Sequence, residues 1–186
     1  MGAEDILLNV EGKMRKAIDV LKEDLAAIRT GRASPGLVSN VRVDYHGVPV
    51  PVNQIASVSV PEARMLVIQP WERDVLSSIE KAILKSDLGL TPTNDGNVIR
   101  LVIPQLTEER RNQLVKMVGK RVEEGKVAVR NVRREGLEKF RELKDSKEIS
   151  EDEQKRALGR LQQITDRYVE EIDQVAQSKE SELMEF

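Results

Sequence analysis

The chain of 186 residues contains no cysteine and a single histidine, His46. Without cysteine it can form neither a disulfide nor a thiolate metal site, and one histidine is too few for the usual zinc ligand sets. The glycine-rich phosphate-binding motifs of nucleotide-binding folds are missing as well. The sequence therefore predicts a protein that is not an enzyme and needs no metal or cofactor, and His46, in a turn, is interpreted as a surface residue.

Long apolar runs and aromatic residues are also scarce. No run approaches the roughly 18 residues that a membrane span requires, and the first residues lack a signal-peptide pattern. We therefore expect a cytoplasmic protein without a membrane partner. Aromatic residues make up 3% of the chain and charged residues 33%, which favours thin helical cores over a thick α/β core. The one tryptophan, Trp71, is interpreted as a core or edge residue rather than a platform for stacking.

The longest regular pattern lies in residues 104–144. Thr107 is a suitable N-cap, and the two glutamates that follow suit the positive end of a helix dipole. Three internal glycines, Gly119, Gly125 and Gly136, each cost about 1 kcal/mol relative to alanine, so we expect them to allow close approach of another helix or to narrow the side-chain layer. Such a helix would be about 55 Å long. Its stripe of apolar or small residues recurs every three or four positions: Leu114, Val118, Val122, Gly125, Val129, Val132, Gly136, Phe140 and Leu143.

Positive charge is concentrated on this one element. Residues 110–144 contain twelve lysines or arginines and five acidic residues, a net charge of +7, in a chain whose net charge is −2. The densest part holds Lys126, Arg130, Arg133 and Arg134 in two adjacent turns. Fixed positive charge on a rigid rod attracts a polyphosphate backbone. The segment therefore predicts a nucleic-acid-binding surface, with a plain solvated helix face as the alternative.

Two further helices flank an α+β segment. The first covers residues 3–29 with a heptad-like apolar stripe, and the last begins at Ser150, where Glu153 completes a capping box. Between residues 31 and 104 the pattern predicts about four strands, at 41–45, 55–60, 65–69 and 98–103, and one helix at 75–86. The short connection before residue 65 predicts an antiparallel hairpin. Residues 46–54, with two prolines, are interpreted as a turn region.

None of the three long helices can bury its stripe alone. We therefore predict an α+β fold in which residues 1–30 and 105–186 form an elongated three-helix bundle and residues 31–104 form a small inserted α+β (β/α/β) domain. Two short crossings would join the domains and act as hinges. The predicted hinge residues are Thr30, Gly31, Arg32, Ala33, Ser34, Pro35, Pro104 and Gln105.

Several long motifs in order along the whole chain resemble ribosome recycling factors. They are RTGRASP at 29–35, SDLGL at 86–90, LTEERR at 106–111, VAVRNVRR at 127–134, KEISED at 147–152 and ELMEF at 182–186. Two departures stand out: His46 follows Tyr45 where the family usually has a second tyrosine, and Gly136 stands where a better helix former is usual.

The resemblance implies an L-shaped, two-domain monomer of tRNA-like outline. It implies binding to large-subunit RNA of a bacterial-type, post-termination ribosome, and separation of the subunits together with elongation factor G, which hydrolyses GTP. A helical RNA-binding or chaperone-like arm protein is the alternative. The family's important basic residues correspond to Arg110, Arg130 and Arg133. With the neighbouring basic residues of the matched motifs and the dense stretch, the predicted RNA-binding set is Arg29, Arg110, Arg111, Lys126, Arg130, Arg133 and Arg134.

Overall fold

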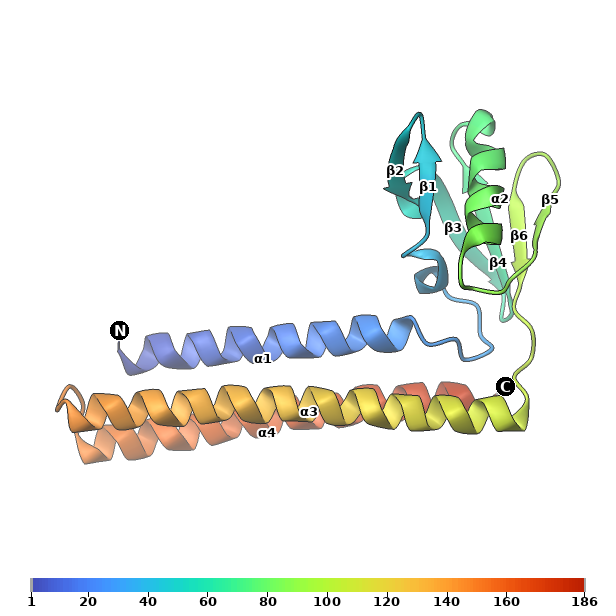
Figure 1. Cartoon of the computed structure of the whole chain (residues 1–186). Helices are drawn as coiled ribbons and strands as arrows, with labels where there is room; N and C mark the ends of the chain where they lie inside the picture. The colour runs from blue at the N-terminus through green and yellow to red at the C-terminus, as the bar shows by residue number, and fades with distance from the viewer. Residues whose placement is uncertain (1, 186) are drawn as a thin grey trace. The chain divides into compact units, whose positions relative to one another are not determined.

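The computed structural model describes residues 2–185. Four α-helices, six β-strands and three short 3-10 turns make up these residues (Figure 1). In chain order they are α1 (Ala3–Ala26), η1 (Pro35–Val38), β1 (Arg42–Tyr45), β2 (Val48–Pro51), η2 (Val52–Gln54), β3 (Ala56–Glu62), β4 (Met65–Pro70), η3 (Arg73–Val75), α2 (Leu76–Lys85), β5 (Pro92–Asn94), β6 (Ile99–Val102), α3 (Glu108–Asp145) and α4 (Glu151–Glu185).

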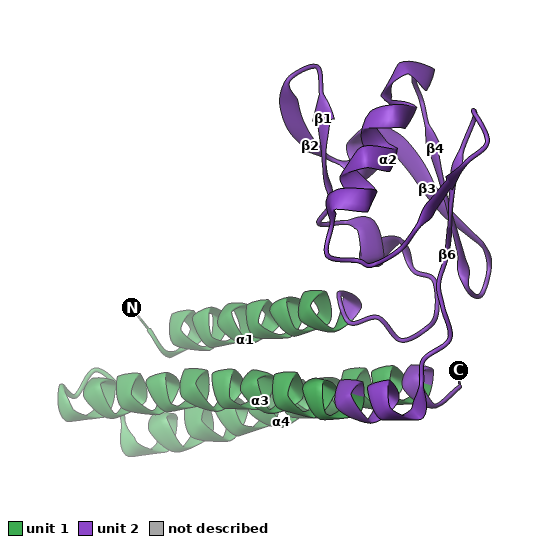
Figure 2. Cartoon of the chain, turned by 45° about the vertical axis from the view of Figure 1, so that its right-hand side comes forward, with its two compact units in different colours: residues 1–25, 115–181 green, residues 26–114, 182–186 purple. Residues whose placement is uncertain are grey.

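The chain divides into two compact units, drawn in separate colours in Figure 2. Unit 1 comprises residues 1–25 and 115–181, and unit 2 comprises residues 26–114 and 182–186. The first turns of α3, up to residue 114, therefore belong to unit 2. The helical bundle and the small antiparallel sheet agree with the predicted α+β fold class.

Unit 1 is a bundle of three helices. Its core contains apolar side chains spaced along each helix, as the periodicity predicts. Ion pairs fix the helix directions, because α1 and α4 pair at a constant sequence separation of 156 residues and are therefore parallel. The α1–α4 pairs are Glu4–Arg160, Glu11–Arg167 and Arg15–Glu171. Tyr168, which is buried, lies between Arg15 and Arg167, whose guanidinium carbons are 5.0 and 5.1 Å from its ring centroid.

Two of the three α3 glycines lie where another helix comes close. A Cβ on Gly136 would be 3.2 Å from Val10 Cγ2 and 3.3 Å from both methyl groups of Leu161, and one on Gly125 would be 3.2 Å from Leu21 Cδ2. The predicted close approach is confirmed at these two positions. It is wrong for Gly119, where a Cβ would meet nothing within 4 Å.

Unit 2 is built on a four-stranded antiparallel sheet of order β3-β4-β6-β5, with β1 and β2 as a separate hairpin. The predicted hairpin of β3 and β4 is confirmed, with Ser57 opposite Gln69 and Val58 opposite Ile68. One face of the sheet packs against α2, whose Ile79 and Ile83 are buried in the same core as the strand residues. The inward-facing strand residues of that core include Leu66, Ile68, Ile99 and Leu101.

The strand count predicted for this segment was too low. Residues 48–51, interpreted as part of a turn region, form β2, which pairs with β1 in a two-stranded ribbon. Each strand of a two-stranded ribbon has one edge without a partner strand. Pro49 and Pro51, which lack a backbone N–H, are therefore tolerated in β2. The three-residue strand β5 was also missed, because its pattern is too short to show a period. Trp71 is not a core residue, since it directly follows β4 with 66% of its surface exposed.

Asp95 organises the turn between β5 and β6. Its carboxylate accepts hydrogen bonds from the backbone N–H groups of Asn97 and Val98, both at 2.9 Å, and pairs with the Arg100 guanidinium. The two backbone hydrogen bonds, followed by Arg100, lower the pKa of Asp95 to about 2. The turn therefore depends on a carboxylate that stays charged.

This arrangement predicts a pH dependence of stability in the acid range. Because the folded-state pKa is depressed, the Asp95 contribution is present above the ordinary value of 3.8 and is lost as the pH falls towards 2. We expect Asp95→Asn to make the thermal unfolding temperature less dependent on pH in that window. Titration of the Asp95 carboxyl carbon by NMR checks the cause, and a midpoint at the ordinary value would contradict it.

Candidate RNA-binding surface

The 38 residues of α3 form the element on which the predicted surface depends. Thr107 caps it as predicted: its Oγ1 accepts from the Arg110 N–H at 3.1 Å, and its carbonyl accepts from the Arg111 N–H at 2.9 Å. At 1.5 Å per residue the helix is about 57 Å long. The apolar stripe of α3 is largely buried in the bundle, and the other positions of the helix can therefore carry charged side chains.

The helix α4 packs antiparallel to α3, and Ser150 caps its N-terminus as predicted, in contact with Glu153. Ser150 Oγ accepts from the Glu153 N–H at 3.1 Å, and its hydroxyl donates to the Glu153 carboxylate at 3.4 Å. Beyond that turn, polar side chains of α4 reach back to α3. These contacts decide which of the α3 cations are already paired.

Lys126 and Arg133 lie on the side of α3 that faces α4. Lys126 Nζ is 2.7 Å from Asp173 Oδ1, and only 25% of the lysine side chain is exposed. Arg133 is half-buried, and its Nε donates to Gln162 Oε1 at 3.1 Å. Lysine 126 is thus neutralised by a carboxylate, whereas Arg133 is held by a neutral amide.

Arg130 and Arg134 lie on the exposed face of the same helix. Arg130 Nη1 is 3.2 Å from Glu123 Oε1, both side chains being largely exposed, so this pair holds the arginine only weakly. Lys116 and Lys120 are exposed at helical spacing on the same face. The sequence pattern included these two lysines in the basic segment but did not single them out.

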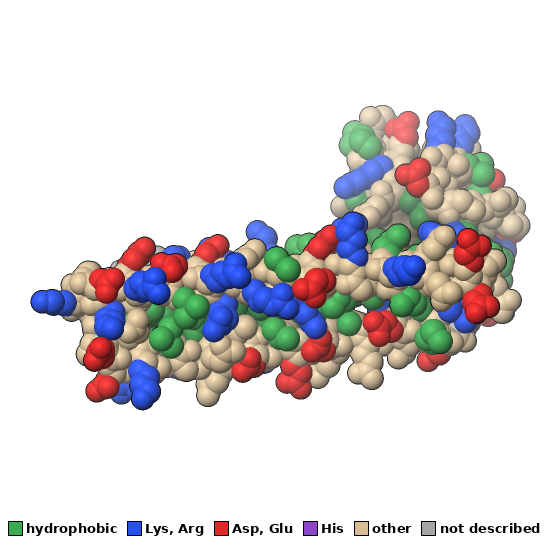
Figure 3. Space-filling view, turned by 60° about the horizontal axis from the view of Figure 1, so that its bottom comes forward, with side chains coloured by type: hydrophobic (Ala, Val, Ile, Leu, Met, Phe, Trp, Pro, Cys, Tyr) green, Lys and Arg blue, Asp and Glu red, His purple; other side chains and the backbone are tan. Residues whose placement is uncertain are grey.

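Figure 3 shows how the charges are distributed over one side of the molecule. Lysine and arginine side chains gather over the middle of the helical unit, with aspartates and glutamates around them. The concentration of positive charge on residues 110–144 follows from the sequence, where this segment has a net charge of +7. A surface of this kind suits a ligand that presents phosphates in a row.

The other three predicted cations belong to unit 2. Arg29 is half-buried and its Nη1 donates to the Leu88 carbonyl at 2.6 Å, which is a structural contact within that unit. Arg110 is exposed and its Nη1 donates to Gln113 Oε1 at 3.0 Å, while Arg111 is half-buried. The predicted set thus divides into four cations on unit 1 and three on unit 2.

The predicted hinge residues also lie within unit 2, which extends from residue 26 to residue 114. Thr30 is buried, and its Oγ1 lies 3.4 Å from Glu182 Oε2. Gly31 has a φ of +83°, which favours glycine, and the Ala33 N–H donates to the Ala63 carbonyl at 2.7 Å. Pro104 and Gln105 are exposed between β6 and α3.

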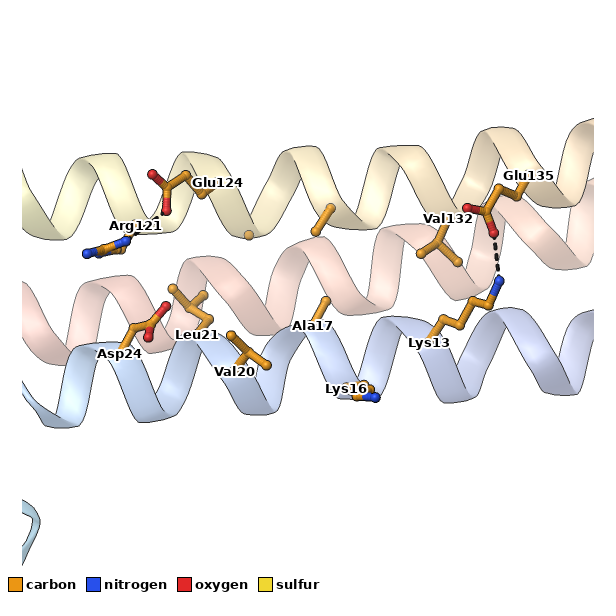
Figure 4. Close-up of a pocket in the computed structure, with 12 residues that line it drawn as sticks. Lys13, Lys16, Ala17, Val20, Leu21, Asp24, Arg121, Glu124, Val132 and Glu135 are labelled. Carbon is orange, nitrogen blue, oxygen red and sulfur yellow. Dashed lines mark hydrogen bonds and ion pairs between the residues drawn. The ribbon is translucent and has the colours of Figure 1, made fainter. Parts of the chain in front are cut away.

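A groove of about 500 Å³ lies between α1 and α3 in unit 1. Its lining includes Ala17, Leu21 and Gly125. Lys13 on α1 reaches across to Glu135 on α3 (Figure 4), and its Nζ is 2.8 Å from Glu135 Oε2. The hydrogen bond from Lys13 lowers the pKa of Glu135. Three bases and three acids line the groove, namely Lys13, Lys16, Arg121, Asp24, Glu124 and Glu135. This balance gives no attraction for a polyanion, so the groove is not part of the basic surface.

Sequence reasoning missed the α4 side chains that hold the α3 cations. Gln162, Asp166 and Asp173 stand on a segment with net negative charge, and nothing in their spacing relates them to Lys126 or Arg133. Only the antiparallel register of the two helices brings them together. No described helix combines the length and the apolar character that crossing a membrane demands.

Comparison with known proteins gives a consistent result. The family model for ribosome recycling factor matches residues 21–184. The ribosome-recycling factor of Syntrophomonas wolfei is 55% identical, and that of Heliobacterium modesticaldum is 56% identical, with 98% and 97% of this chain and 98% of each relative covered.

Solved structures agree. A solution structure of the ribosome recycling factor has a TM-score of 0.81 and 47% identity, covering all of this chain and 99% of that one. A second, at TM-score 0.72 and 46% identity with 98% and 99% coverage, belongs to models of the T. thermophilus ribosome recycling factor and the E. coli elongation factor G bound to the E. coli post-termination complex. Likeness at this level over the full length leaves one conclusion: the chain belongs to the ribosome recycling factor family.

Proposed function

We propose that this protein binds the post-termination ribosome and, together with elongation factor G, separates it into subunits so that mRNA and tRNA are released. The observation that carries the proposal is the identity of more than half the residues to ribosome-recycling factors over nearly the whole chain. A structural relative placed with elongation factor G on a post-termination complex supports the same partners.

The proposed contact with large-subunit RNA uses the basic residues of α3, chiefly Arg130, Arg133 and Arg134. Arginine offers a planar fork of donors that matches phosphate oxygens. Arg134 and Arg130 are exposed, and Arg133 is held without being neutralised. Lys126, paired with Asp173, can join only by leaving that carboxylate. Arg110, Arg111 and Arg29 complete the proposed set from unit 2.

The protein itself hydrolyses nothing in this proposal, because the GTP is bound and cleaved by elongation factor G. It acts in the cytoplasm, as a monomer, without a metal or cofactor. The proposed domains are residues 1–30 with 105–186 and residues 31–104. The proposed hinges are residues 30–35 and 104–105, where short loop segments can absorb changes in φ and ψ.

The test is a subunit-splitting assay. Purified post-termination ribosomes are mixed with this protein, elongation factor G and GTP, and splitting is followed by light scattering. We expect splitting only when all components are present. Ribosome binding without splitting would instead favour the alternative of a general RNA-binding arm protein.

Binding should weaken steeply with salt. Each phosphate contact adds about −0.7 to −0.9 to the slope of log affinity against log salt concentration, because bound counterions are released. We expect a slope of roughly −2 to −4 if three or four α3 cations reach phosphates. Sedimentation binding at several KCl concentrations measures the slope, and an affinity that does not change with salt would contradict the role of the basic face.

A further inference from the structure

Arg133 differs from its basic neighbours in the chemistry of its partner. Lys126 pairs with the Asp173 carboxylate at 2.7 Å, and Arg130 pairs with the Glu123 carboxylate at 3.2 Å. Arg133 donates its Nε–H to the amide oxygen of Gln162 at 3.1 Å. An amide accepts a hydrogen bond but carries no charge, so the positive charge of Arg133 is not cancelled.

Asp166 fixes which way the Gln162 amide points. The Gln162 Nε2 donates to Asp166 Oδ1 at 2.8 Å, one helical turn along α4. An ionised carboxylate can only accept, so the NH₂ end of the amide must face Asp166 and the oxygen must face Arg133. Asp166, Gln162 and Arg133 therefore form a directed chain of hydrogen bonds from α4 to α3.

This hydrogen-bond chain uses one of the five N–H donors of the Arg133 guanidinium, the one on Nε. The four donors on Nη1 and Nη2 can be directed to a ligand. A planar group with its Nε–H held in place has lost much of its rotational freedom before any ligand arrives. Holding a side chain in its bound orientation beforehand reduces the entropy cost of binding. The half-buried position of Arg133 adds to this restraint.

We propose that Gln162, oriented by Asp166, is a positioning residue that presents Arg133 to a ribosomal RNA phosphate without neutralising it. The inference rests on the proposed function, because it needs Arg133 to contact RNA. The helix α4 is acidic overall. In this proposal it contributes to RNA binding through Arg133, without contacting the RNA itself.

A double-mutant cycle tests the proposal with full-length protein and vacant ribosomes. We expect Gln162→Ala to weaken ribosome binding by about threefold to tenfold, a coupling within the usual range for residues in one hydrogen-bond network. In an Arg133→Ala background the same change should have no further effect. Gln163→Ala, at the neighbouring exposed position of α4, is the matched control and should bind like the wild type.

Gln162→Glu separates positioning from mere structural support. Glutamate still accepts from Arg133 Nε but adds a negative charge, so binding should fall at least as far as in Gln162→Ala while unfolding in urea stays near wild type. The Nε–H resonance of Arg133, read by NMR without ribosomes, should exchange faster with water in Gln162→Ala.

The outcomes distinguish the two ideas. Full binding by Arg133→Ala would overturn the proposed RNA contact and this inference with it. Weak binding by Arg133→Ala but normal binding by Gln162→Ala would overturn the positioning role alone. Equal losses from Gln162→Ala in both backgrounds would also overturn it, because Gln162 would then act independently of Arg133.

Discussion

Arg133→Ala is expected to lower ribosome affinity by about tenfold to a hundredfold, because a charge-assisted hydrogen bond contributes about 1.5–3 kcal/mol. The side chain is held by Gln162 and not by a carboxylate, so its removal takes away charge that no internal partner had cancelled. The fold should tolerate the change, since surface substitutions usually alter stability by less than about 0.5 kcal/mol. Ribosome sedimentation and urea unfolding, run on the same samples, measure both quantities.

The matched control for this prediction is Arg156→Ala, an exposed arginine on the acidic helix α4. Arg167 is less suitable, because it pairs with Glu11 and lies over the Tyr168 ring, so its loss would disturb the bundle. We expect Arg156→Ala to bind ribosomes like the wild type. A similar loss from both substitutions would mean that affinity follows net charge and not the α3 surface.

Gly136→Leu is expected to destabilise the helical bundle by about 2–3 kcal/mol or more, the cost of overpacking a closed core. The first added carbon alone would already lie 3.2 Å from Val10 and 3.3 Å from Leu161, and the rest of the side chain has no space. Chemical unfolding followed by helical circular dichroism measures the effect.

Gly119→Leu is the matched control, in the same helix and with the same change. A Cβ at Gly119 meets nothing within 4 Å, and glycine is the poorer helix former by about 0.8–1.0 kcal/mol relative to alanine. This variant should therefore be as stable as the wild type or more stable. Equal destabilisation by the two substitutions would show that the close packing at Gly136 does not limit side-chain size.

The long helices could be predicted from the sequence because their periods are long and regular. Within each long helix the apolar residues recur every three or four positions, and most of the stripe is buried, for example Val10 and Met14 on α1, Val118 and Phe140 on α3, and Leu161 on α4. The strand β2 was harder to predict, because its two prolines cannot donate backbone hydrogen bonds and so argue against a central strand. They are tolerated here because β2 pairs only with β1. The core alternative for Trp71 was wrong, because this side chain directly follows β4 and is exposed.

The candidate surface was predictable in its charge but not in its details. Counting lysines and arginines located the basic segment, yet it could not tell that Arg29 donates to the Leu88 carbonyl. It also could not tell which α3 cations are neutralised, because their partners Asp173 and Gln162 come from α4, 47 and 29 residues away. Such pairs depend on how two helices are aligned, and composition does not contain that alignment.

The 156-residue separation between paired residues of α1 and α4 has a consequence for synthesis of the protein. At about 5–20 residues per second, each of these α1 residues is synthesised roughly 8–30 s before its α4 partner. During that interval α3 is translated, and it can cover part of the α1 stripe, because Gly136 of α3 lies close to Val10 of α1. Residues 26–114 of unit 2, which include the whole sheet, are translated before α4, so assembly of the sheet can precede assembly of the bundle. The helical unit therefore cannot be completed until α4 has been translated, whereas the sheet needs only residues that come before it.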